Sequence, residues 1–291
     1  MKTEYIIRKA KDFIPWRLRY WLKIMEAKHP GFIPGIWKQK SDLEYYNQVF
    51  YDALNVLGLK DLKNKTICEM GPGQFLSHAF LSFQLGAERS YLLEIADFAN
   101  CKKEVKMNAD LFLPENMTRI RKLPRPSEHI SWKEYLKAVQ SRYYTNGLSG
   151  YKGIPDNSVN LVCSFSVIEH IRKNVFEQTM QETYRFLQGG GIAYHTVDLK
   201  DHFGGGKNHL RFEEHEWEDD IHYRMDNYTN RLSFSEICSI WKRTGFFIEI
   251  IDKAFMDEKN RINRKNLASS LKHMSDEDLM ISEFTAVLRK E

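Results

Sequence analysis

Two glutamates and two glycines are the residues of this chain whose types and spacing best suit the binding of a ligand. Glu69 ends a short apolar run and is followed by Gly71 and Gly73, and a second apolar run ends in Glu94. Glycine lets the backbone approach a ligand closely because it has no Cβ. A carboxylate at the end of a second strand can accept hydrogen bonds from both hydroxyls of a ribose. The pattern therefore indicates a strand, a glycine turn and a helix that hold a nucleoside-like molecule.

Leu76 separates two classes of nucleotide ligand. The dinucleotide fingerprint needs a small residue at this position, so that the helix can pack closely on a pyrophosphate. Leucine stands there in this chain. A nicotinamide-dependent oxidoreductase is therefore disfavoured, and a nucleoside without a pyrophosphate fits better.

Two later segments predict further strands of the same sheet. Residues 154–170 begin with a Pro-Asp-Asn turn and continue as an apolar strand that ends in Glu169 and His170. In residues 186–197 a helix is expected to stop at three glycines, with a strand directly after them. Alternation of helices and strands favours a parallel sheet that is covered on both faces.

With these pieces in this order, the chain resembles the class I S-adenosylmethionine-dependent methyltransferases over about residues 60–290. The likeness is greatest to the type 11-like branch, whose fourth strand ends in Ile/Leu-Glu-His and whose fifth follows Leu-x-x-Gly-Gly. Residues 98–99 and 198–202 look like a subgroup often encoded among surface-polysaccharide genes. The resemblance implies an α/β fold with a doubly wound, mostly parallel seven-stranded sheet, a Rossmann-like methyltransferase sheet, and S-adenosyl-L-methionine as cofactor.

The resemblance also implies which residues hold the cofactor. Glu69, Gly71 and Gly73 would shape the pocket for the methionine part, and Glu94 would take the ribose hydroxyls. Three further residues lie after the third strand or at the end of the fourth, where they would reach the adenine and the rest of the cofactor: Asn146, Ser164 and Phe165.

An acceptor hydroxyl loses a proton during methyl transfer, so a general base helps the reaction. His170, Asp198 and His202 follow the predicted fourth and fifth strands, at the ligand edge of the sheet. We favour His202, or the pair of Asp198 and His202. His170 could equally orient its loop together with Glu169, and His195, inside a strand, is expected to be a core histidine.

Residues 199–231 are expected to recognise the acceptor. The segment lacks core periodicity, so a packing role explains it poorly. Its aromatic, basic and amide side chains suit stacking and hydrogen bonding to a sugar, and the expected substrate-binding residues are His209, Arg211, Tyr228, Asn230 and Arg231. A sugar hydroxyl of a glycan or small molecule is therefore the favoured acceptor. Two alternatives stay open: a lipid or quinone-like acceptor at the membrane surface, and a non-catalytic cofactor-binding partner protein.

A metal site is the less favoured alternative. Some methyltransferases that share Glu-His after the fourth strand bind a divalent ion through two glutamates and histidines, but Ser166 stands three residues before Glu169, where that pattern has its first glutamate. The four cysteines are widely spaced and lack the Cys-x-x-Cys pattern of a zinc site. Reduced thiols in a cytoplasmic protein are the natural interpretation.

Composition favours an ordinary globular protein, with 42% hydrophobic and 28% charged residues among 291. No apolar run reaches the roughly 18 residues that a membrane span needs. The net charge of +4 is concentrated in residues 1–28, which hold eight Lys or Arg against three Asp or Glu. Because the remainder is close to neutral, a nucleic-acid partner is not expected.

The chain divides into an N-terminal helical extension, residues 1–60, and a methyltransferase domain, residues 61–291. The domain carries a helical insertion at about residues 100–140. An apolar stripe of Leu18, Trp21, Leu22 and Met25 predicts a helix over residues 16–28. This helix would serve as a lid, or would touch the anionic inner membrane surface through its basic side chains. The oligomeric state is left open.

Further elements follow from periodicity and capping residues. Helices are expected over residues 43–57, 132–140, 233–244 and 267–274, and strands over residues 143–146, 246–251 and 284–288.

Overall fold

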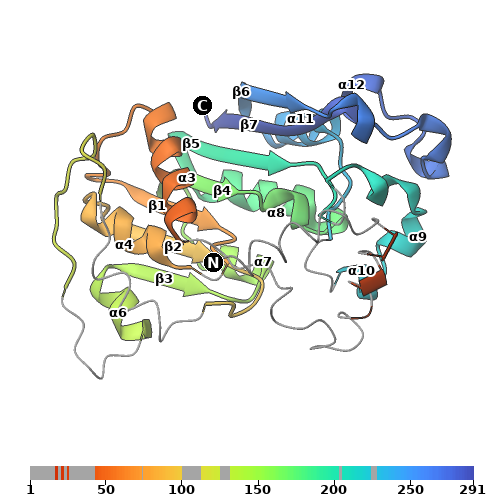
Figure 1. Ribbon diagram of the computed structural model, residues 1–291. Coiled ribbons are helices and arrows are strands. Elements are labelled where there is room, and N and C mark those ends of the chain that lie inside the picture. Colours follow the sequence, from red (N-terminus) through yellow and green to blue (C-terminus); the bar gives the residue numbers. More distant parts are fainter. Residues whose placement is uncertain are drawn as a thin grey trace, which may run out of the picture.

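The computed structural model describes residues 17–18, 21–22, 25, 43–73, 75–99, 113–124, 132–202, 205–223 and 228–291. Seven strands form one sheet in the order β3-β2-β1-β4-β5-β7-β6 (Figure 1). They are β1 (Thr66–Met70), β2 (Arg89–Leu93), β3 (Ser141–Tyr144), β4 (Val159–Phe165), β5 (Leu187–Asp198), β6 (Phe247–Phe255) and β7 (Ile281–Arg289). The pairs among β1 to β5 are parallel, and β7 runs antiparallel between β5 and β6. The expected doubly wound, mostly parallel Rossmann-like methyltransferase sheet is confirmed.

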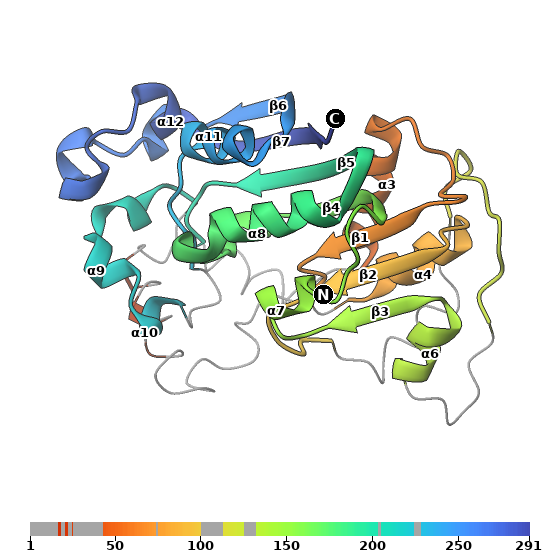
Figure 2. The ribbon, with the colours of Figure 1, turned by 180° about the vertical axis from the view of Figure 1, so that it is seen from behind.

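Helices cover both faces of the sheet (Figures 1 and 2). One face carries α3 (Leu43–Val56), α4 (Ser77–Gln84) and α6 (Trp132–Ala138), and the other carries α7 (Leu148–Tyr151), α8 (Lys173–Phe186) and α11 (Phe234–Thr244). The strands are therefore apolar on both sides, as parallel sheets require. In β1, for example, Ile67 packs under α3 and α4, whereas Cys68 packs under α8. Full burial of each large apolar side chain contributes about 1.5–3 kcal/mol.

The strand order reverses between β1 and β4. In open parallel sheets, ligands bind at such a switch point, outside the carboxyl ends of the strands. Glu69 lies near the carboxyl end of β1, Glu94 directly follows β2, and Glu169 and His170 follow β4 in the 3-10 turn η2 (Ile168–His170). The sheet thus brings the acidic residues and the expected catalytic residues to one edge.

Helix α11 matches its sequence prediction closely. Ser233 accepts a hydrogen bond from the backbone of Glu236 and the Glu236 side chain accepts one in return, which forms a capping box. Gly245 ends the helix with φ 108°, in the left-handed region that glycine tolerates. Cys68 and Cys163 are buried free thiols in core strands, as expected, and Cys101 lies outside the described residues.

Several boundaries differ from expectation. Strand β3 begins and ends two residues earlier than predicted, so Asn146 lies in the loop beyond it. Residues 189–191 do not stop a helix, because α8 ends at Phe186 and β5 begins directly at Leu187. The glycines instead form an irregularity opposite the start of β4. Residues 267–274 contain only the 3-10 turn η6 (Ser269–Leu271), after η5 (Arg264–Asn266), and α12 (Asp276–Met280) was not predicted.

The segment after β5 is more ordered than its lack of periodicity predicted. It contains η3 (Asn208–Arg211), α9 (Glu214–Trp217) and α10 (Asp220–Tyr223). The Trp217 side chain is fully buried, and its indole Nε1 donates to Thr229 O at 2.7 Å. The expectation that packing explains this segment poorly is therefore wrong. Short helices with one buried face each make the packing, and they are too short to give a periodic pattern.

The described residues of the amino-terminal segment, which are residues 17–18, 21–22 and 25, lie near α10 (Figures 1 and 2). In the insertion at about 100–140, residues 100–112 and 125–131 lie outside the described residues. Within the described part of the chain, no helix is long and apolar enough to cross a membrane.

Candidate active site

The turn between β1 and α4 has a backbone shape that depends on glycine. Gly71 and Gly73 have φ values of +67° and +63°. A Cβ on Gly71 would lie 2.4 Å from Cγ1 of Val167, so no larger residue fits between this turn and the loop after β4. A Cβ on Gly73 would meet nothing within 4 Å, so this glycine faces open space. The turn is thus tight on one side and accessible to a ligand on the other.

Glu94 joins the turn to the end of β2. Its Oε2 accepts a hydrogen bond from Gly73 N at 3.0 Å, and its Oε1 accepts one from Ile95 N at 2.9 Å. Burial raises the pKa of this carboxyl group, while the two backbone donors oppose that shift. The Glu94 carbonyl also accepts from Gly147 N at 3.0 Å, which brings the loop after β3, with exposed Asn146, to the same edge.

Glu69 is held from two helices. Its side chain is 4% exposed, and its Oε1 accepts hydrogen bonds from the Tyr46 hydroxyl and from His78 Nδ1, the latter at 2.7 Å. Its Oε2 is buried without a partner. A buried carboxylate oxygen is costly to leave unpaired, so this atom is a ready acceptor for a donor from a ligand or a water molecule.

His78 has a polar partner at each ring nitrogen. Its Nδ1 lies 2.7 Å from Glu69 Oε1, and its Nε2 lies 2.9 Å from the Tyr46 carbonyl oxygen. The imidazole is stacked between the rings of Tyr46, at 3.8 Å, and Phe50, at 4.6 Å. The Phe165 ring meets it edge-on at 5.6 Å, which places Phe165 with Glu69 on this face of the sheet. Tyr46 and His78 were not predicted as site residues, although the aromatic residues of the helix over 43–57 are visible in the sequence.

Ser164 faces the opposite side of the sheet. It is fully buried, and its Oγ lies 2.7 Å from His195 Nδ1. His195 is also fully buried and stacks on Trp241 at 5.7 Å, which confirms it as a core histidine. Burial lowers its pKa to about 3. The Ser164 side chain is therefore not available to a ligand, and the prediction of Ser164 as a cofactor-binding side chain is wrong.

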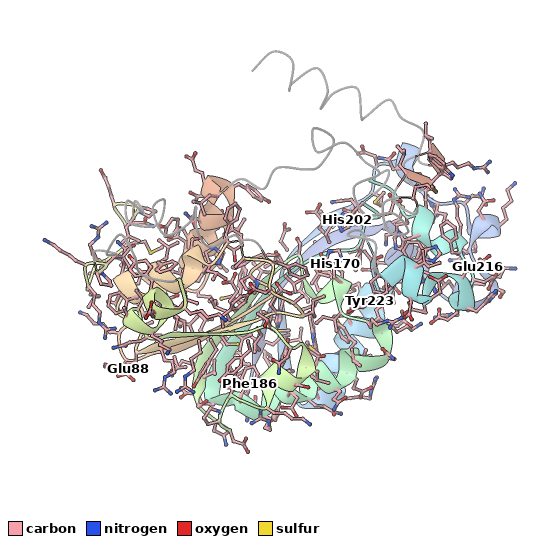
Figure 3. The ribbon with its side chains drawn as sticks, turned by 90° about the horizontal axis from the view of Figure 1, so that it is seen from below. Glu88, His170, Phe186, His202, Glu216 and Tyr223 are labelled. Atoms are coloured by element: carbon pink, nitrogen blue, oxygen red, sulfur yellow. The ribbon has the colours of Figure 1, made fainter. Side chains whose placement is uncertain are left out.

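His170 and His202 lie side by side at the carboxyl edge, opposite the end that Glu88 and Phe186 mark (Figure 3). Their ring centroids are 5.1 Å apart. His170 Nδ1 donates to the Tyr228 carbonyl, so the neutral ring carries its lone pair on Nε2. Nearby Ser166 is exposed and has φ 52°, a conformation that is strained for a serine.

Asp198 ends β5 and is paired with Lys200. Its Oδ1 accepts from Lys200 N at 2.9 Å and lies 3.4 Å from Lys200 Nζ. Its own backbone N–H donates to Glu169 Oε1 at 3.2 Å. The structure therefore brings Asp198 together with Glu169 and Lys200, whereas His202 lies with His170.

Of the five residues expected to bind the acceptor, only Arg211 is partly exposed. The other four are buried, with 1–3% of their surface exposed: His209, Tyr228, Asn230 and Arg231. Asn230 donates from Nδ2 to the carbonyls of Ile168 and Ile171, both at 2.9 Å, and thereby holds η2. The Tyr228 hydroxyl donates to Glu218 at 2.8 Å.

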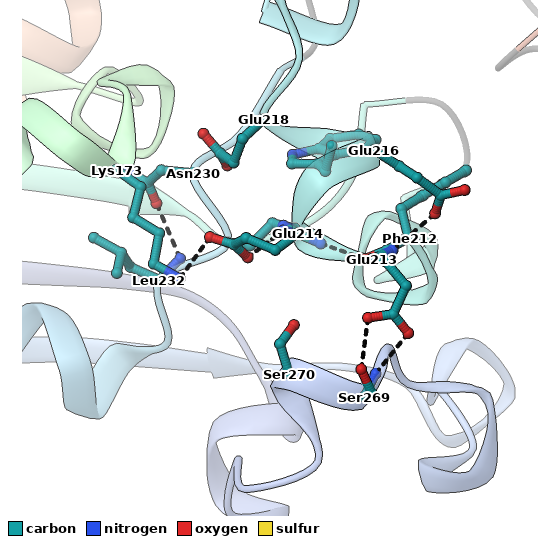
Figure 4. Close-up of polar contacts among 12 residues, drawn as sticks. Lys173, Phe212, Glu213, Glu214, Glu216, Glu218, Asn230, Leu232, Ser269 and Ser270 are labelled. Atoms are coloured by element: carbon teal, nitrogen blue, oxygen red, sulfur yellow. Dashed lines mark hydrogen bonds and ion pairs between the residues drawn. The ribbon is translucent and has the colours of Figure 1, made fainter.

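Arg231 is part of an ion-pair network around α9. It donates to Glu214 at 2.6 Å, and Glu214 also accepts from Lys173 at 3.2 Å. Figure 4 shows the contact of Lys173 with Glu214, together with the two hydrogen bonds that Ser269 N and Oγ donate to Glu213. These side chains fix the segment after β5 onto the sheet. Among the residues that the structure describes, no group of three or more His, Cys, Asp or Glu side chains is arranged to hold a metal ion.

Comparison with known proteins gives similarities of fold only. No protein-family model matches the chain, and no curated protein matches it. Among solved structures, the YcgJ protein from Bacillus subtilis is 13% identical, with 83% of this chain and 99% of that chain covered, at a TM-score of 0.45. An S-adenosylmethionine-dependent methyltransferase from Mesorhizobium loti is also 13% identical, with 82% and 97% covered, at a TM-score of 0.44.

A third similar structure is phosphoethanolamine N-methyltransferase 2 from Haemonchus contortus, in complex with phosphomonomethylethanolamine and S-adenosylhomocysteine. It is 15% identical, with 84% of this chain and 52% of that chain covered, at a TM-score of 0.47. Because each TM-score is below 0.5, the fold assignment rests on the strand order and register of this chain.

Proposed function

We propose that this chain binds S-adenosylmethionine and transfers its methyl group to a small-molecule or glycan acceptor, with a sugar hydroxyl as the preferred acceptor. The observation that carries the proposal is the hydrogen bond from Gly73 N to Glu94, at 3.0 Å. It joins the glycine turn after β1 to the carboxylate after β2, at the switch point of the sheet. A nucleoside ligand needs both groups in one place.

The residues present suit this cofactor. Glu94 would accept hydrogen bonds from the ribose hydroxyls, and the open side of Gly73 leaves room for backbone approach. The unpartnered Oε2 of Glu69 would accept from the ammonium group of the methionine part, directly or through water. Asn146 and Phe165 would lie toward the adenine. S-adenosylmethionine supplies a methyl group already activated by its sulfonium.

The pair of His170 and His202 would take up the proton of the acceptor. A base must lie within hydrogen-bond reach of the reacting hydroxyl and have a pKa near the working pH, which suits histidine. The Tyr228 carbonyl keeps the Nδ1 proton on His170 and leaves Nε2 as the acceptor. His202 remains our favoured base because it is the exposed member of the pair. The residues proposed to bind the cofactor and the histidine pair proposed to take up the proton would then act without a metal ion.

A sugar acceptor is supported by aromatic and cationic groups in or beside the segment after β5 that are not fully buried. Arg211 is partly exposed, and the guanidinium of Arg172 lies 4.3 Å from the ring centroid of Tyr223, which Figure 3 shows close to His170. Aromatic and cationic groups of this kind bind sugars by stacking and hydrogen bonding. We infer a cytoplasmic enzyme, where S-adenosylmethionine is supplied.

Calorimetric titration with S-adenosylhomocysteine and, separately, with NAD tests the cofactor. We expect one site per chain for the first ligand and no binding of the second. The acceptor is then sought by mass spectrometry of co-purified ligands and by S-adenosylhomocysteine release with nucleotide sugars and oligosaccharides. Absence of both heat and thermal stabilisation with S-adenosylhomocysteine would refute the proposal.

A lipid or quinone-like acceptor at a membrane surface is the second candidate. Leu18 and Trp21, on the described part of the amino-terminal helix, are each 48% exposed, and residues 1–28 are strongly basic. Exposed aromatic and basic side chains favour an anionic interface. Salt-sensitive co-sedimentation with vesicles that contain phosphatidylglycerol, and none with phosphatidylcholine vesicles, would favour this candidate.

A further inference from the structure

One buried amide joins the segment after β5 to the turn that carries His170. Asn230 is 1% exposed, and its Nδ2 donates to the carbonyls of Ile168 and Ile171, both at 2.9 Å. Its backbone N–H donates to the Glu169 carbonyl at 2.7 Å. Three hydrogen bonds from one residue therefore hold the backbone of the turn on both sides of His170.

The orientation of the Asn230 amide follows from its partners. Its Oδ1 accepts from Leu232 N at 3.1 Å, two residues further along the chain, which is the contact of an Asx turn. If the amide were reversed, Oδ1 would face the two carbonyl oxygens of η2, and a carbonyl cannot donate. Both donors of this side chain are therefore committed to η2.

The same stretch of chain orients the ring of His170. His170 Nδ1 donates to the carbonyl of Tyr228, two residues before Asn230. A hydrogen bond at one ring nitrogen sets which nitrogen of a neutral histidine carries the proton. A free histidine prefers the proton on Nε2, so this contact selects the less stable tautomer. Residues 228–230 thus locate the turn and also select the form of its imidazole.

The backbone at Arg231 turns the next side chain away from η2. Arg231 has φ 60°, which is uncommon for a residue with a side chain. Its guanidinium donates to the Phe212 carbonyl and to Glu214, both at 2.6 Å, whereas the Asn230 amide faces η2. A strained backbone conformation persists only where the surrounding structure holds it. Here the contacts around α9 hold it on one side and η2 holds it on the other.

We propose that Asn230 is a positioning residue for His170. It acts through η2: the amide holds the turn where the Tyr228 carbonyl keeps the proton on Nδ1, so that Nε2 carries the lone pair at the carboxyl edge. The role rests on the function proposed above, in which His170 and His202 take up the proton of the acceptor. An amide that served packing alone would stabilise the fold without affecting the tautomer of His170.

NMR of the full chain labelled with ¹⁵N-histidine measures this tautomer and needs no acceptor. Protonated and unprotonated nitrogens of a neutral imidazole differ widely in ¹⁵N chemical shift, and the signals lost in His170→Gln assign the residue. At about pH 9, where histidine is neutral, we expect the proton of wild-type His170 on Nδ1. A wild-type ring with its proton on Nε2 would overturn the proposal without any change at position 230.

Two variants test the amide itself. Asn230→Ala removes both donors and should move most of His170 to the Nε2–H form, and Asn230→Ser, which keeps one donor, should give a mixture of the two forms. The matched control is Thr183→Val, which removes a buried hydroxyl that donates to the Thr179 carbonyl at 2.8 Å in α8. The control should keep the wild-type tautomer. Unchanged His170 signals in the Asn230 variants would overturn the proposal.

Turnover separates positioning of the base from packing. With nucleotide sugars as acceptors, kcat of Asn230→Ala should fall by about 10–100-fold, the cost of misplacing a reacting group by up to about 1 Å. The Kd for S-adenosylhomocysteine should stay unchanged, and Thr183→Val should keep both values. A switch of tautomer with full kcat would reject the positioning role. A wild-type protein that does not bind S-adenosylhomocysteine would instead refute the methyltransferase function, so the two failures are told apart.

Discussion

At the scale of single residues, Glu94 is the side chain on which cofactor binding depends most. Glu94→Ala should raise the Kd for S-adenosylhomocysteine by about 10–100-fold, because hydrogen bonds to a charged acceptor contribute about 1.5–3 kcal/mol. Calorimetry measures this change. Asp97→Ala, three residues away and exposed, is the matched control and should bind normally. An unchanged Kd in Glu94→Ala would mean that the carboxylate only ties the end of β2 to Gly73.

Tyr46 should affect cofactor binding from outside the sheet. Tyr46→Phe removes the hydroxyl that donates to Glu69 but keeps the ring that stacks on His78. One hydrogen bond contributes about 0.5–1.5 kcal/mol, so we expect a Kd for S-adenosylhomocysteine that is about 2–10-fold higher. Tyr45→Phe changes the neighbouring ring, which is 70% exposed, and should have no effect. Equal affinities in the two variants would show that Glu69 does not need Tyr46.

His202 should govern turnover and leave cofactor affinity unchanged. His202→Ala should lower kcat by about 10²–10⁴-fold, the usual contribution of a positioned general base. The wild-type rate should fall as the pH drops through the histidine range, because an imidazolium cannot accept the proton. Steady-state rates from pH 5.5 to 8.5, with calorimetry of cofactor binding, measure both effects. Near-normal turnover of the variant with an unaltered pH profile would move the base to His170 or Asp198.

At the scale of elements, the sequence correctly predicts features that depend only on residues close together in the chain, such as strand ends and helix caps. The two strands that end in Glu69 and Glu94 are short apolar runs with local end signals, so their meeting at one edge follows from the parallel sheet alone. The capping box of α11 is equally local. Pairs across longer separations escape such reasoning: Tyr46 reaches Glu69 only because α3 packs on α4, which no local pattern encodes.

The prediction that residues 189–191 end a helix was wrong for a different reason. A run of glycines usually ends a helix, but here the hydrogen bond of Gly190 N to the Lys290 carbonyl keeps the run in the sheet. The prediction for the segment after β5 was wrong for a third reason, because its buried residues are spread over helices of about one turn each. The acceptor-binding residues could not be separated from packing residues there, since the same side-chain types do both.

The boundary of the catalytic unit is an element-scale prediction. The proposed division at residue 60 would remove α3, and with it Tyr46 and Phe50, which enclose His78. Deletion of residues 1–28 should therefore leave S-adenosylhomocysteine binding nearly intact and impair acceptor turnover, because the helix beside α10 is lost. Deletion of residues 1–60 should abolish both. Calorimetry and turnover of the two truncations measure this. Normal cofactor binding without residues 1–60 would restore the boundary at 60, and full turnover without residues 1–28 would contradict the role of the helix.

At the scale of the whole molecule, three buried titratable groups shape the dependence of stability on pH. Burial lowers the pKa of His195 to about 3, so its uncharged state favours folding above the normal histidine pKa and loses that benefit as the pH falls. Burial lowers the pKa of Lys207 to about 8, so stability rises with pH above that value. Glu169 acts in the opposite direction, because burial raises its pKa to about 8.

Comparison of wild type with Glu169→Gln between pH 6.5 and 8 isolates the contribution of Glu169. In this range the folded state keeps a proton on Glu169 that the unfolded chain has lost, so the contribution of Glu169 to the free energy of unfolding should fall as the pH rises, by up to about 1.4 kcal/mol per pH unit. Glu169→Gln keeps an acceptor for Asp198 N and cannot ionise, so this loss should disappear. Urea unfolding of both proteins at three pH values, in constant chloride, measures the difference, and Glu115→Gln, at an exposed site, is the control. The stability of Glu169→Gln relative to wild type should increase steadily from pH 6.5 to 8. Parallel curves would show that Glu169 is already ionised when folded.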